Sequence, residues 1–306
     1  MNVIDTSGMS REQWLALRRQ SIGASDAPVI AGLSKYKSRF ALWLEKTGQA
    51  EPEEAGEEAW WGTQLEDLIN RRLNERDDFA GIQRMQVMVR HPRVSWMTAT
   101  LDMIEDAQKE QVWEHKAVGI NAGKKLEDGN VSTLPDAWIL QSHHQMMCAE
   151  VEHINFAVFV GHRLNLYRFR VEWSEEIGMG LAQLETEFRR HVEDRTPPAE
   201  FDPQDAALLL KHYREIEGPP LELSPTEFGE HVTAYKEAVS EIAYAEAIRD
   251  KAKARLLAAM GNAPSAVCGP YLMRRSIVNV KTQEPKPKAA YSYTKFTFTN
   301  TESDDV

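Results

Sequence analysis

The sequence WMTATLDMI at residues 96–104 is followed by QVWEHKAV at residues 111–118. Both stretches tend towards a period of two, and polar residues from Glu105 to Glu110 separate them, so we predict two strands in an antiparallel hairpin. Side chains two apart in a strand share a face, which places Glu114 and Lys116 together. Asp102, at the end of the preceding strand, is then expected to meet them.

Two carboxylates and a backbone carbonyl at such a point are the hard oxygen ligands that Mg²⁺ takes while it keeps several waters. A lysine beside the ion can orient a water molecule and stabilise the charge that grows on a phosphate under attack. The structural alternative is a surface ion pair between Glu114 and Lys116. The pattern is too short to decide by itself.

The chain before this hairpin shows the sequence patterns of helices. Ser10 and Gln13 predict a capping box at a first helix, and Ser25 is expected to be the N-cap of a short second one. Amphipathic helices are predicted at residues 38–47 and 60–74. On the latter helix one side is expected to hold the apolar residues Trp61, Leu65, Leu68, Ile69 and Leu73.

Further elements are predicted along the rest of the chain. These are a strand at residues 87–89, a helix at 135–150, a hairpin of strands 154–160 and 166–171, a helix at 181–192, a long helix at 227–260 and a β-like tail at 271–280. The long helix carries apolar residues at alternating spacings of four and three, which is typical of helix-on-helix packing. We therefore divide the chain into a core at residues 1–200 and a C-terminal appendage at residues 205–306.

Composition restricts the classes of protein. The chain has 306 residues, 42% of them hydrophobic, and no apolar run near the roughly 18 residues of a membrane span. Two cysteines are too few for a disulfide framework or an iron–sulfur cluster, and the N-terminus lacks a secretory signal, so we expect a cytoplasmic protein. His143, His144, Cys148 and His153 do not keep a zinc spacing, which favours core and helix-surface roles.

The net charge of −11 is unevenly distributed. Residues 1–50 contain seven basic and four acidic side chains, whereas residues 51–80 contain ten acidic and three basic ones. Taken by itself, a total of −11 argues against a polyanionic partner. Because the charge is segregated, it stays compatible with a local basic face that binds nucleic acid.

Four more residues are candidates around the hairpin. Glu66 lies on a predicted helix, and Gln141 lies on the helix after the hairpin. Ser25 at a helix start is a natural anion site, and Arg18 could contact a phosphate through two parallel hydrogen bonds. Taken singly, these residues are equally explained as a helix cap or as polar helix surface.

Together, five motifs in order resemble the YqaJ-type phage recombination exonucleases, which include the lambda exonuclease, within the PD-(D/E)XK nuclease superfamily. The matching stretches are residues 14–26, 61–66, 100–102, 114–116 and 141–146, within roughly residues 10–195. The resemblance implies an α/β (α+β) fold: a restriction-endonuclease-like core with a central mixed β-sheet flanked by helices, followed by a helical C-terminal appendage.

The resemblance also implies roles for single residues. Asp102, Glu114 and the main-chain carbonyl of His115 would bind a metal ion, and Lys116 would be the catalytic lysine. Glu66 would support a second ion, the metal being Mg²⁺ with Mn²⁺ as an alternative. The terminal 5′-phosphate of DNA would be held by Arg18, Ser25, Thr100 and Gln141.

Two positions depart from the family pattern. A second acidic metal ligand is expected on the preceding strand, around residues 89–93, where this chain has Val-Arg-His-Pro-Arg and His91 is the candidate substitute. Leu101 also stands where the superfamily name has proline.

The implied function is a Mg²⁺-dependent 5′→3′ exonuclease that digests one strand of linear double-stranded DNA and leaves a 3′ overhang. The implied partners are DNA ends, a single-strand annealing protein and two further copies in a ring-shaped homotrimer, encoded by a phage or prophage in a bacterial cell. Two alternatives remain open from the sequence. One is a DNA-end-binding protein with little catalysis, and the other is an endonuclease of the same superfamily.

Overall fold

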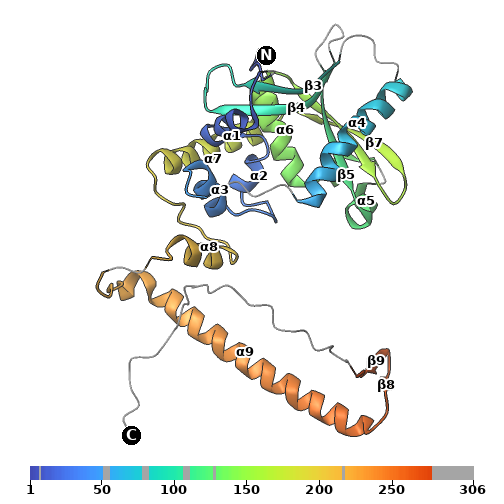
Figure 1. Ribbon diagram of the computed structural model, residues 1–306, viewed down its shortest axis with the longest axis vertical. Helices are drawn as coiled ribbons and strands as arrows, with labels where there is room; N and C mark the ends of the chain where they lie inside the picture. The colour runs from blue at the N-terminus through green and yellow to red at the C-terminus, as the bar shows by residue number, and fades with distance from the viewer. Residues whose placement is uncertain are drawn as a thin grey trace. The chain divides into compact units, whose positions relative to one another are not determined.

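The computed structural model describes residues 1–6, 8–50, 56–77, 83–105, 111–126, 129–215 and 218–277. It consists of two compact units, Met1–His212 and a second one that begins at Tyr213 (Figure 1). No helix in these ranges is long and apolar enough to cross a membrane.

A mixed sheet of seven strands organises the described part of the first unit. The strands are β1 (Asn2–Val3), β2 (Ile22–Gly23), β3 (Gln83–Arg90), β4 (Met97–Glu105), β5 (Gln111–Val118), β6 (His153–Val160) and β7 (Asn165–Glu172). The order is β1-β3-β4-β5-β6-β7, with β2 parallel to β4. β5 and β6 are parallel, and the other neighbours are antiparallel. Both predicted hairpins are confirmed, although residues 106–110 of the first turn lie outside the described residues.

The parallel pair β5–β6 requires a crossover connection, which is provided chiefly by a helix. After α5 (Ile120–Leu126) and a 3₁₀ turn (Val131–Thr133), α6 (Asp136–Ala149) passes across the sheet (Figure 1). Its apolar residues Met146, Cys148 and Ala149 join the main core. The helix also buries the polar run Ser142, His143, His144 and Gln145. Polar groups that are buried in this way need hydrogen-bond partners, and these partners lead to the site described below.

Helices at the N-terminus and C-terminus of the first unit build a second core. They are α2 (Ala27–Ile30), α3 (Arg39–Lys46), α7 (Glu175–Glu193) and α8 (Asp205–His212). Helix α1 (Arg11–Gln20) lies against α3 and β2 and buries none of its own side chains. The predicted capping box at Ser10 is confirmed. The prediction that Ser25 is an N-cap is wrong, because Asp26 occupies that position. The Asp26 carboxylate accepts a hydrogen bond from the Gly23 N–H at 2.8 Å and pairs with the Lys46 ammonium at 2.6 Å, so it locks the turn that contains Ser25.

Helix α4 (Glu57–Asp77) covers the other end of the sheet. Leu65, Ile69 and Leu73, spaced four apart, pack on Trp113 and the strands around it. The predicted apolar side is therefore only partly correct. The other two residues assigned to it, Trp61 and Leu68, are each 51% exposed.

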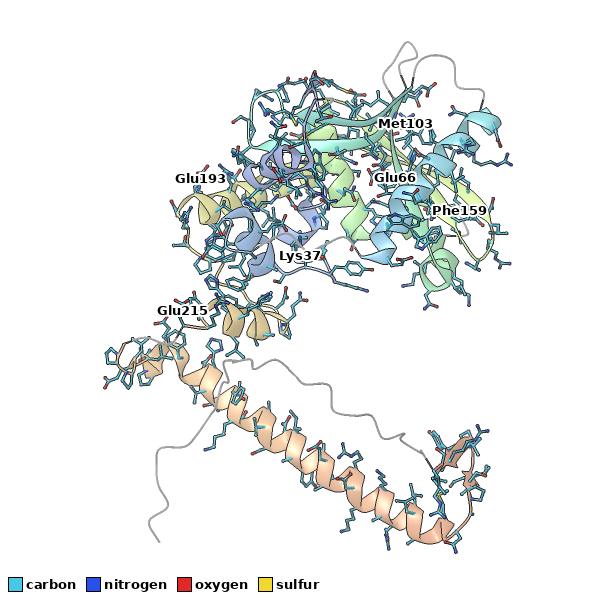
Figure 2. All side chains as sticks on the ribbon, viewed as in Figure 1. Lys37, Glu66, Met103, Phe159, Glu193 and Glu215 are labelled. Carbon is cyan, nitrogen blue, oxygen red and sulfur yellow. The ribbon has the colours of Figure 1, made fainter. Side chains whose placement is uncertain are left out.

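The second unit contains α9 (Pro225–Met260) and a hairpin of β8 (Ser265–Cys268) and β9 (Tyr271–Arg274). The long helix and a strand at 271 were expected; the pairing of this strand with β8 was not. Side chains of α9 project on all sides, and none of them is buried (Figure 2). Helix α8, which the sequence-based division assigned to the appendage, contributes Asp205 to a buried hydrogen bond with Ser38 of the first unit. The division itself stays a prediction.

Candidate active site

Strands β4 and β5 separate beside Asp102. Their ladder stops at the pair Met103↔Trp113, while β5 continues to pair with β6 as far as Val118. On the β4 side the backbone of His115 is thus free of the ladder, and its N–H donates to Oδ2 of Asp102 at 2.7 Å. The N–H and C=O of one strand residue point to the same edge. The carbonyl oxygen of His115 therefore faces the same gap as the Asp102 carboxylate.

Glu114 is the most heavily hydrogen-bonded side chain of this gap. Its Oε1 accepts from Nζ of Lys116 and from Nε2 of Gln141, both at 2.6 Å. Its Oε2 accepts from Nε2 of Gln145 at 2.6 Å. Glu114 and Lys116 share a face as predicted, and α6 fixes both through Gln141, whose Oε1 accepts from Lys116 at 3.1 Å.

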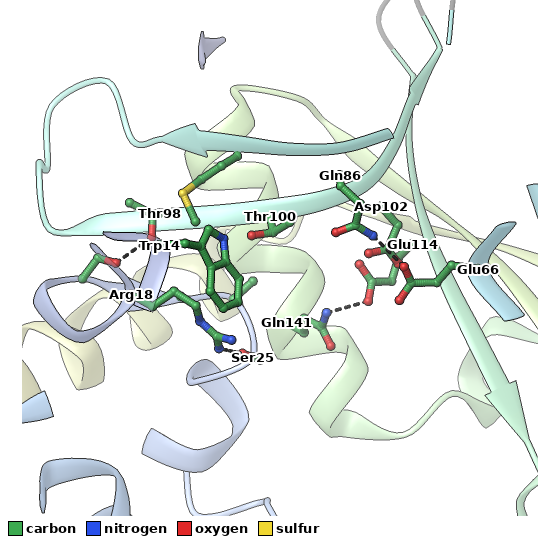
Figure 3. A pocket seen from close by; sticks show the side chains of 14 residues that line it. Trp14, Arg18, Ser25, Glu66, Gln86, Thr98, Thr100, Asp102, Glu114 and Gln141 are labelled. Carbon is green, nitrogen blue, oxygen red and sulfur yellow. Dashed lines mark hydrogen bonds between the residues drawn. The ribbon is translucent and has the colours of Figure 1, made fainter. Parts of the chain in front are cut away.

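Glu66 reaches the same place from α4. Its Oε2 accepts a hydrogen bond from Nε2 of Gln86 at 2.6 Å, and both residues line one pocket with Asp102 and Glu114 (Figure 3). Gln86 lies opposite Asp102 in the β3–β4 register and has a φ of 53°. A polar side chain of the neighbouring strand is thus presented to the carboxylates.

This register corrects the expectation about the preceding strand. The expected position of a ligand, residues 89–93 with His91 as the candidate, lies several residues further along the chain than Gln86. The Nδ1 of His91 accepts hydrogen bonds from the N–H groups of Arg93 and Val94 at 3.1 and 3.0 Å. His91 is not among the residues that line the pocket. Gln86 was missed because strand register is set by pairing between distant parts of the chain, which one sequence does not display.

The carboxylates repel one another in this setting. Burial, followed by the charge of Glu114, raises the pKa of Asp102 well above its ordinary value. Burial and the charge of Glu114 also raise the pKa of Glu66. Burial alone would lower the pKa of Lys116, but the neighbouring carboxylates, Glu114 foremost, outweigh it and raise that pKa. One lysine thus faces three carboxyl groups, and the cluster lacks positive charge.

The chemistry of these donors fits a divalent cation of the hard type. Two carboxylates and a backbone carbonyl face one gap, and a cation there would relieve their repulsion. As the side chains stand, no three His, Cys, Asp or Glu groups among the described residues converge closely enough to hold an ion. Asp102 is turned to the His115 N–H and Glu114 to its three donors, so ion binding would require these carboxylates to exchange partners.

The opposite end of the pocket is basic. Nη2 of Arg18 donates to Oγ of Ser25 at 3.2 Å, and the guanidinium stacks 5.0 Å from the ring centre of Trp14. Figure 3 shows these residues at one end and the carboxylates at the other, with Thr100 between them. The pocket measures about 300 Å³.

Apart from His91, the structure therefore brings the sequence-predicted side chains to one place, either in the lining of this pocket or, for Lys116, in contact with Glu114. One of them differs in position from the expectation. Gln141 was grouped with the phosphate-binding residues, but its side chain contacts Glu114 and Lys116. Trp14 was not predicted to line the pocket, because an apolar side chain of this kind usually indicates a residue of the hydrophobic core. Its spacing of four from Arg18 on a helix is the signal that could have found it.

The chain is similar in sequence to one family of known proteins. An uncharacterized protein, YqaJ of Bacillus subtilis (strain 168), is 31% identical over 216 residues. Residues 13–152 match the YqaJ-like viral recombinase domain. This range is therefore a YqaJ-like viral recombinase domain. The matched range includes every residue of the pocket described above. The alignment with YqaJ covers 69% of this chain and 66% of that protein, slightly less than two thirds of its length.

Solved structures similar to the chain include two exonucleases. The alkaline exonuclease LHK-Exo of Laribacter hongkongensis is 18% identical, with a TM-score of 0.47, over 65% of this chain and 99% of that one. A phage related exonuclease of Haemophilus somnus 129PT is 11% identical, with a TM-score of 0.47, over 59% of this chain and 97% of that one. The fold of this chain is the expected mixed α/β one, with helices around a central mixed sheet.

Proposed function

We propose that this YqaJ-like protein is a metal-dependent nuclease, and specifically a 5′→3′ exonuclease that acts on the ends of linear double-stranded DNA. One observation carries the proposal. A single pocket of a YqaJ-like domain holds Asp102, Glu114 and Glu66 at one end and Arg18 with Ser25 at the other. This arrangement suits one phosphate that is cleaved and a second phosphate that is held.

In the proposed mechanism, Asp102, Glu114 and the His115 carbonyl would hold a Mg²⁺ or Mn²⁺ ion, and Glu66 would support a second one. The bound metal supplies Lewis-acid polarisation of the scissile phosphate. Lys116, held between Glu114 and Gln141, orients the attacking water by donating a hydrogen bond to it. Because Lys116 stays protonated beside carboxylates, its charge also stabilises the phosphate as negative charge grows on it.

The basic end of the pocket is proposed to hold the terminal 5′-phosphate. A guanidinium can donate two parallel hydrogen bonds to a phosphate, and the hydroxyl groups of Ser25 and Thr100 can donate further ones. The stacking of Arg18 on Trp14 keeps the guanidinium in place before DNA arrives. A held end phosphate sets which phosphodiester bond lies at the carboxylates.

Two alternatives remain to be tested against this proposal. A DNA-end-binding protein with little catalysis is favoured by Gln86, an amide where a further carboxylate would strengthen metal binding. An endonuclease of the same superfamily would use the same carboxylates and lysine. The intact set of Asp102, Glu114 and Lys116 supports catalysis.

One experiment separates the three functions. The purified protein is incubated with Mg²⁺ and labelled duplex that is linear with a 5′-phosphate, linear with a 5′-hydroxyl, or circular. An exonuclease of the proposed kind releases nucleotides from the first, works about 10²-fold more slowly on the second and leaves circles intact. Cut circles would indicate an endonuclease, and binding without release would indicate an end-binding protein.

The proposed partners follow from the similarity to this family and need their own tests. A homotrimer that encloses DNA would have three times the 34.8 kDa chain mass in light scattering after gel filtration. A single-strand annealing protein encoded beside this chain in a phage or prophage would copurify with it from a bacterial cytoplasm. A monomeric mass, or an annealing protein that never copurifies, would contradict these two assignments.

A further inference from the structure

A second, larger pocket adjoins the candidate active site. It measures about 610 Å³ and lies between the C-terminal ends of α1 and α7 and the connection from β3 to β4. Ser21 lines both pockets, and its Oγ accepts a hydrogen bond from Oγ1 of Thr98 at 2.9 Å. Arg18 and Arg19 are consecutive on α1 and line different pockets. The end of α1 is therefore the shared wall.

Basic side chains dominate this second pocket. Its lining includes Arg19, Arg90, Arg189 and Lys46 but only one carboxylate among the described residues, that of Glu193. Glu193 accepts a hydrogen bond from Nε of Arg189 at 2.7 Å. Arg189 also donates from Nη1 to the carbonyl of Gln20 at 3.0 Å, which leaves further guanidinium N–H groups for a ligand. Lys46 is neutralised by its buried pair with Asp26, so the excess of positive charge in the lining comes from the arginines.

An aromatic side chain completes the lining. Trp96 is half-buried at the start of β4, where it packs against both cores and still faces the pocket. Arginines bind phosphates through a planar fork, and aromatic rings stack on unpaired bases. This combination is typical of sites for single-stranded nucleic acid, which need no particular base sequence.

We propose that this second pocket binds an unpaired stretch of DNA that extends past the base-paired end, with its phosphates on Arg90 and Arg189 and a base against Trp96. The proposal rests on the proposed function for the choice of DNA as the ligand. The two pockets would then have separate tasks. The first seats an end phosphate, and the second holds single-stranded DNA that lies beyond it. An overhang of either polarity carries this chemistry, so the test includes both.

The test measures binding without cleavage. Fluorescence anisotropy in EDTA compares 5′-hydroxyl duplexes that are blunt, have a 5′ overhang or have a 3′ overhang. We expect the protein to bind one of the overhang duplexes several-fold more tightly than the blunt one. Arg90→Gln and Arg189→Gln should abolish this preference, and each should reduce the salt dependence by about one counterion. Arg190→Gln is the matched control, because Arg190 is exposed on α7 and does not line the pocket.

Each outcome decides the proposal. Preference for one overhang that is lost in Arg90→Gln and Arg189→Gln supports the site and identifies the strand. No preference in the wild type, or equal losses on blunt and overhang duplexes, overturns it. Digestion of blunt 5′-phosphate duplex with Mg²⁺ is measured separately and should be unchanged in Arg190→Gln. A wild type that digests nothing would refute the proposed function. The binding proposal would still be decided by the anisotropy measurements, which are made in EDTA without digestion.

Discussion

His144 and Glu185 form a fully buried ion pair that joins α6 to α7 beside the candidate site. Nδ1 of His144 lies 2.7 Å from Oε1 of Glu185, and both side chains are 0% exposed. The other ring nitrogen, Nε2, lies 2.9 Å from the carbonyl oxygen of Thr98 on β4. A carbonyl oxygen can only accept a hydrogen bond, so Nε2 must carry a proton. The carboxylate of Glu185 also accepts, so Nδ1 carries a second proton and His144 is an imidazolium.

The first prediction concerns the stability that this pair confers. Glu185→Gln should lower the free energy of unfolding by about 3–5 kcal/mol near pH 6, because without the carboxylate His144 must either stay charged without a partner or give up its proton. Denaturant unfolding of the two proteins measures the difference. Glu187→Gln, an exposed change two residues along the same helix, is the control and should stay within about 0.5 kcal/mol of the wild type.

The second prediction concerns pH. Burial alone would lower the pKa of His144, but the charge of Glu185 foremost, together with Cys148, raises it well above its ordinary value. The folded chain therefore keeps a proton that the unfolded chain releases near pH 6.5. Stability from the pair is complete below that pH and is lost as the pH rises through the raised folded pKa.

Unfolding free energies measured from about pH 6 upwards test this sign. The wild type should lose stability steadily above about pH 6.5. In Glu185→Gln this loss should be much smaller, because the neutral amide no longer holds the proton on His144. A mutant that follows the same pH dependence as the wild type would contradict the assignment of the charge to His144.

The contrast between Glu114 and Gln86 illustrates what the sequence could predict. Glu114 and Lys116 are two apart in a strand, so their shared face follows from local geometry alone. Gln86 meets Asp102 only through the register of β3 on β4 and a left-handed backbone at φ 53°, neither of which has a local signature. The roles of Glu66 and Arg18 were reached through the family pattern instead of through spacing.

The pairing of His144 with Glu185 could not be predicted from the sequence for a similar reason. Its partners are 41 residues apart on two helices, and a histidine on a helix reads equally as core or surface. The wrong N-cap at Ser25 has a different cause. Ser25 and Asp26 are both good cap residues, and tertiary pairing of Asp26 with Lys46 decides between them.

The third prediction uses Gln86 to test metal binding. Gln86→Glu adds a carboxylate that faces Glu66 across the pocket, where the amide now donates at 2.6 Å. A further hard oxygen ligand should strengthen the second ion site, so half-maximal activity should need about tenfold less Mn²⁺ or Mg²⁺. Titration of activity with each metal measures the change. Gln83→Glu, on the same strand, is the control, and an equal shift there would mean that general negative charge is responsible.

The last prediction separates stability from activity at Asp102. Burial and the charge of Glu114 disfavour the ionised form of Asp102, so its charge destabilises the metal-free fold. Asp102→Asn keeps an oxygen that can accept from the His115 N–H but removes the repulsion. In EDTA the variant should unfold at a higher temperature, because its free energy of unfolding rises by an amount on the order of 1 kcal/mol. Its rate of DNA digestion should fall by about 10²-fold or more.

The metal dependence of stability provides the control. Excess Mg²⁺ should raise the melting temperature of the wild type more than that of Asp102→Asn, since the carboxylate is the proposed ligand. A variant that is less stable in EDTA, or that still digests DNA at the wild-type rate, would show that Asp102 is a structural residue and not part of a metal site.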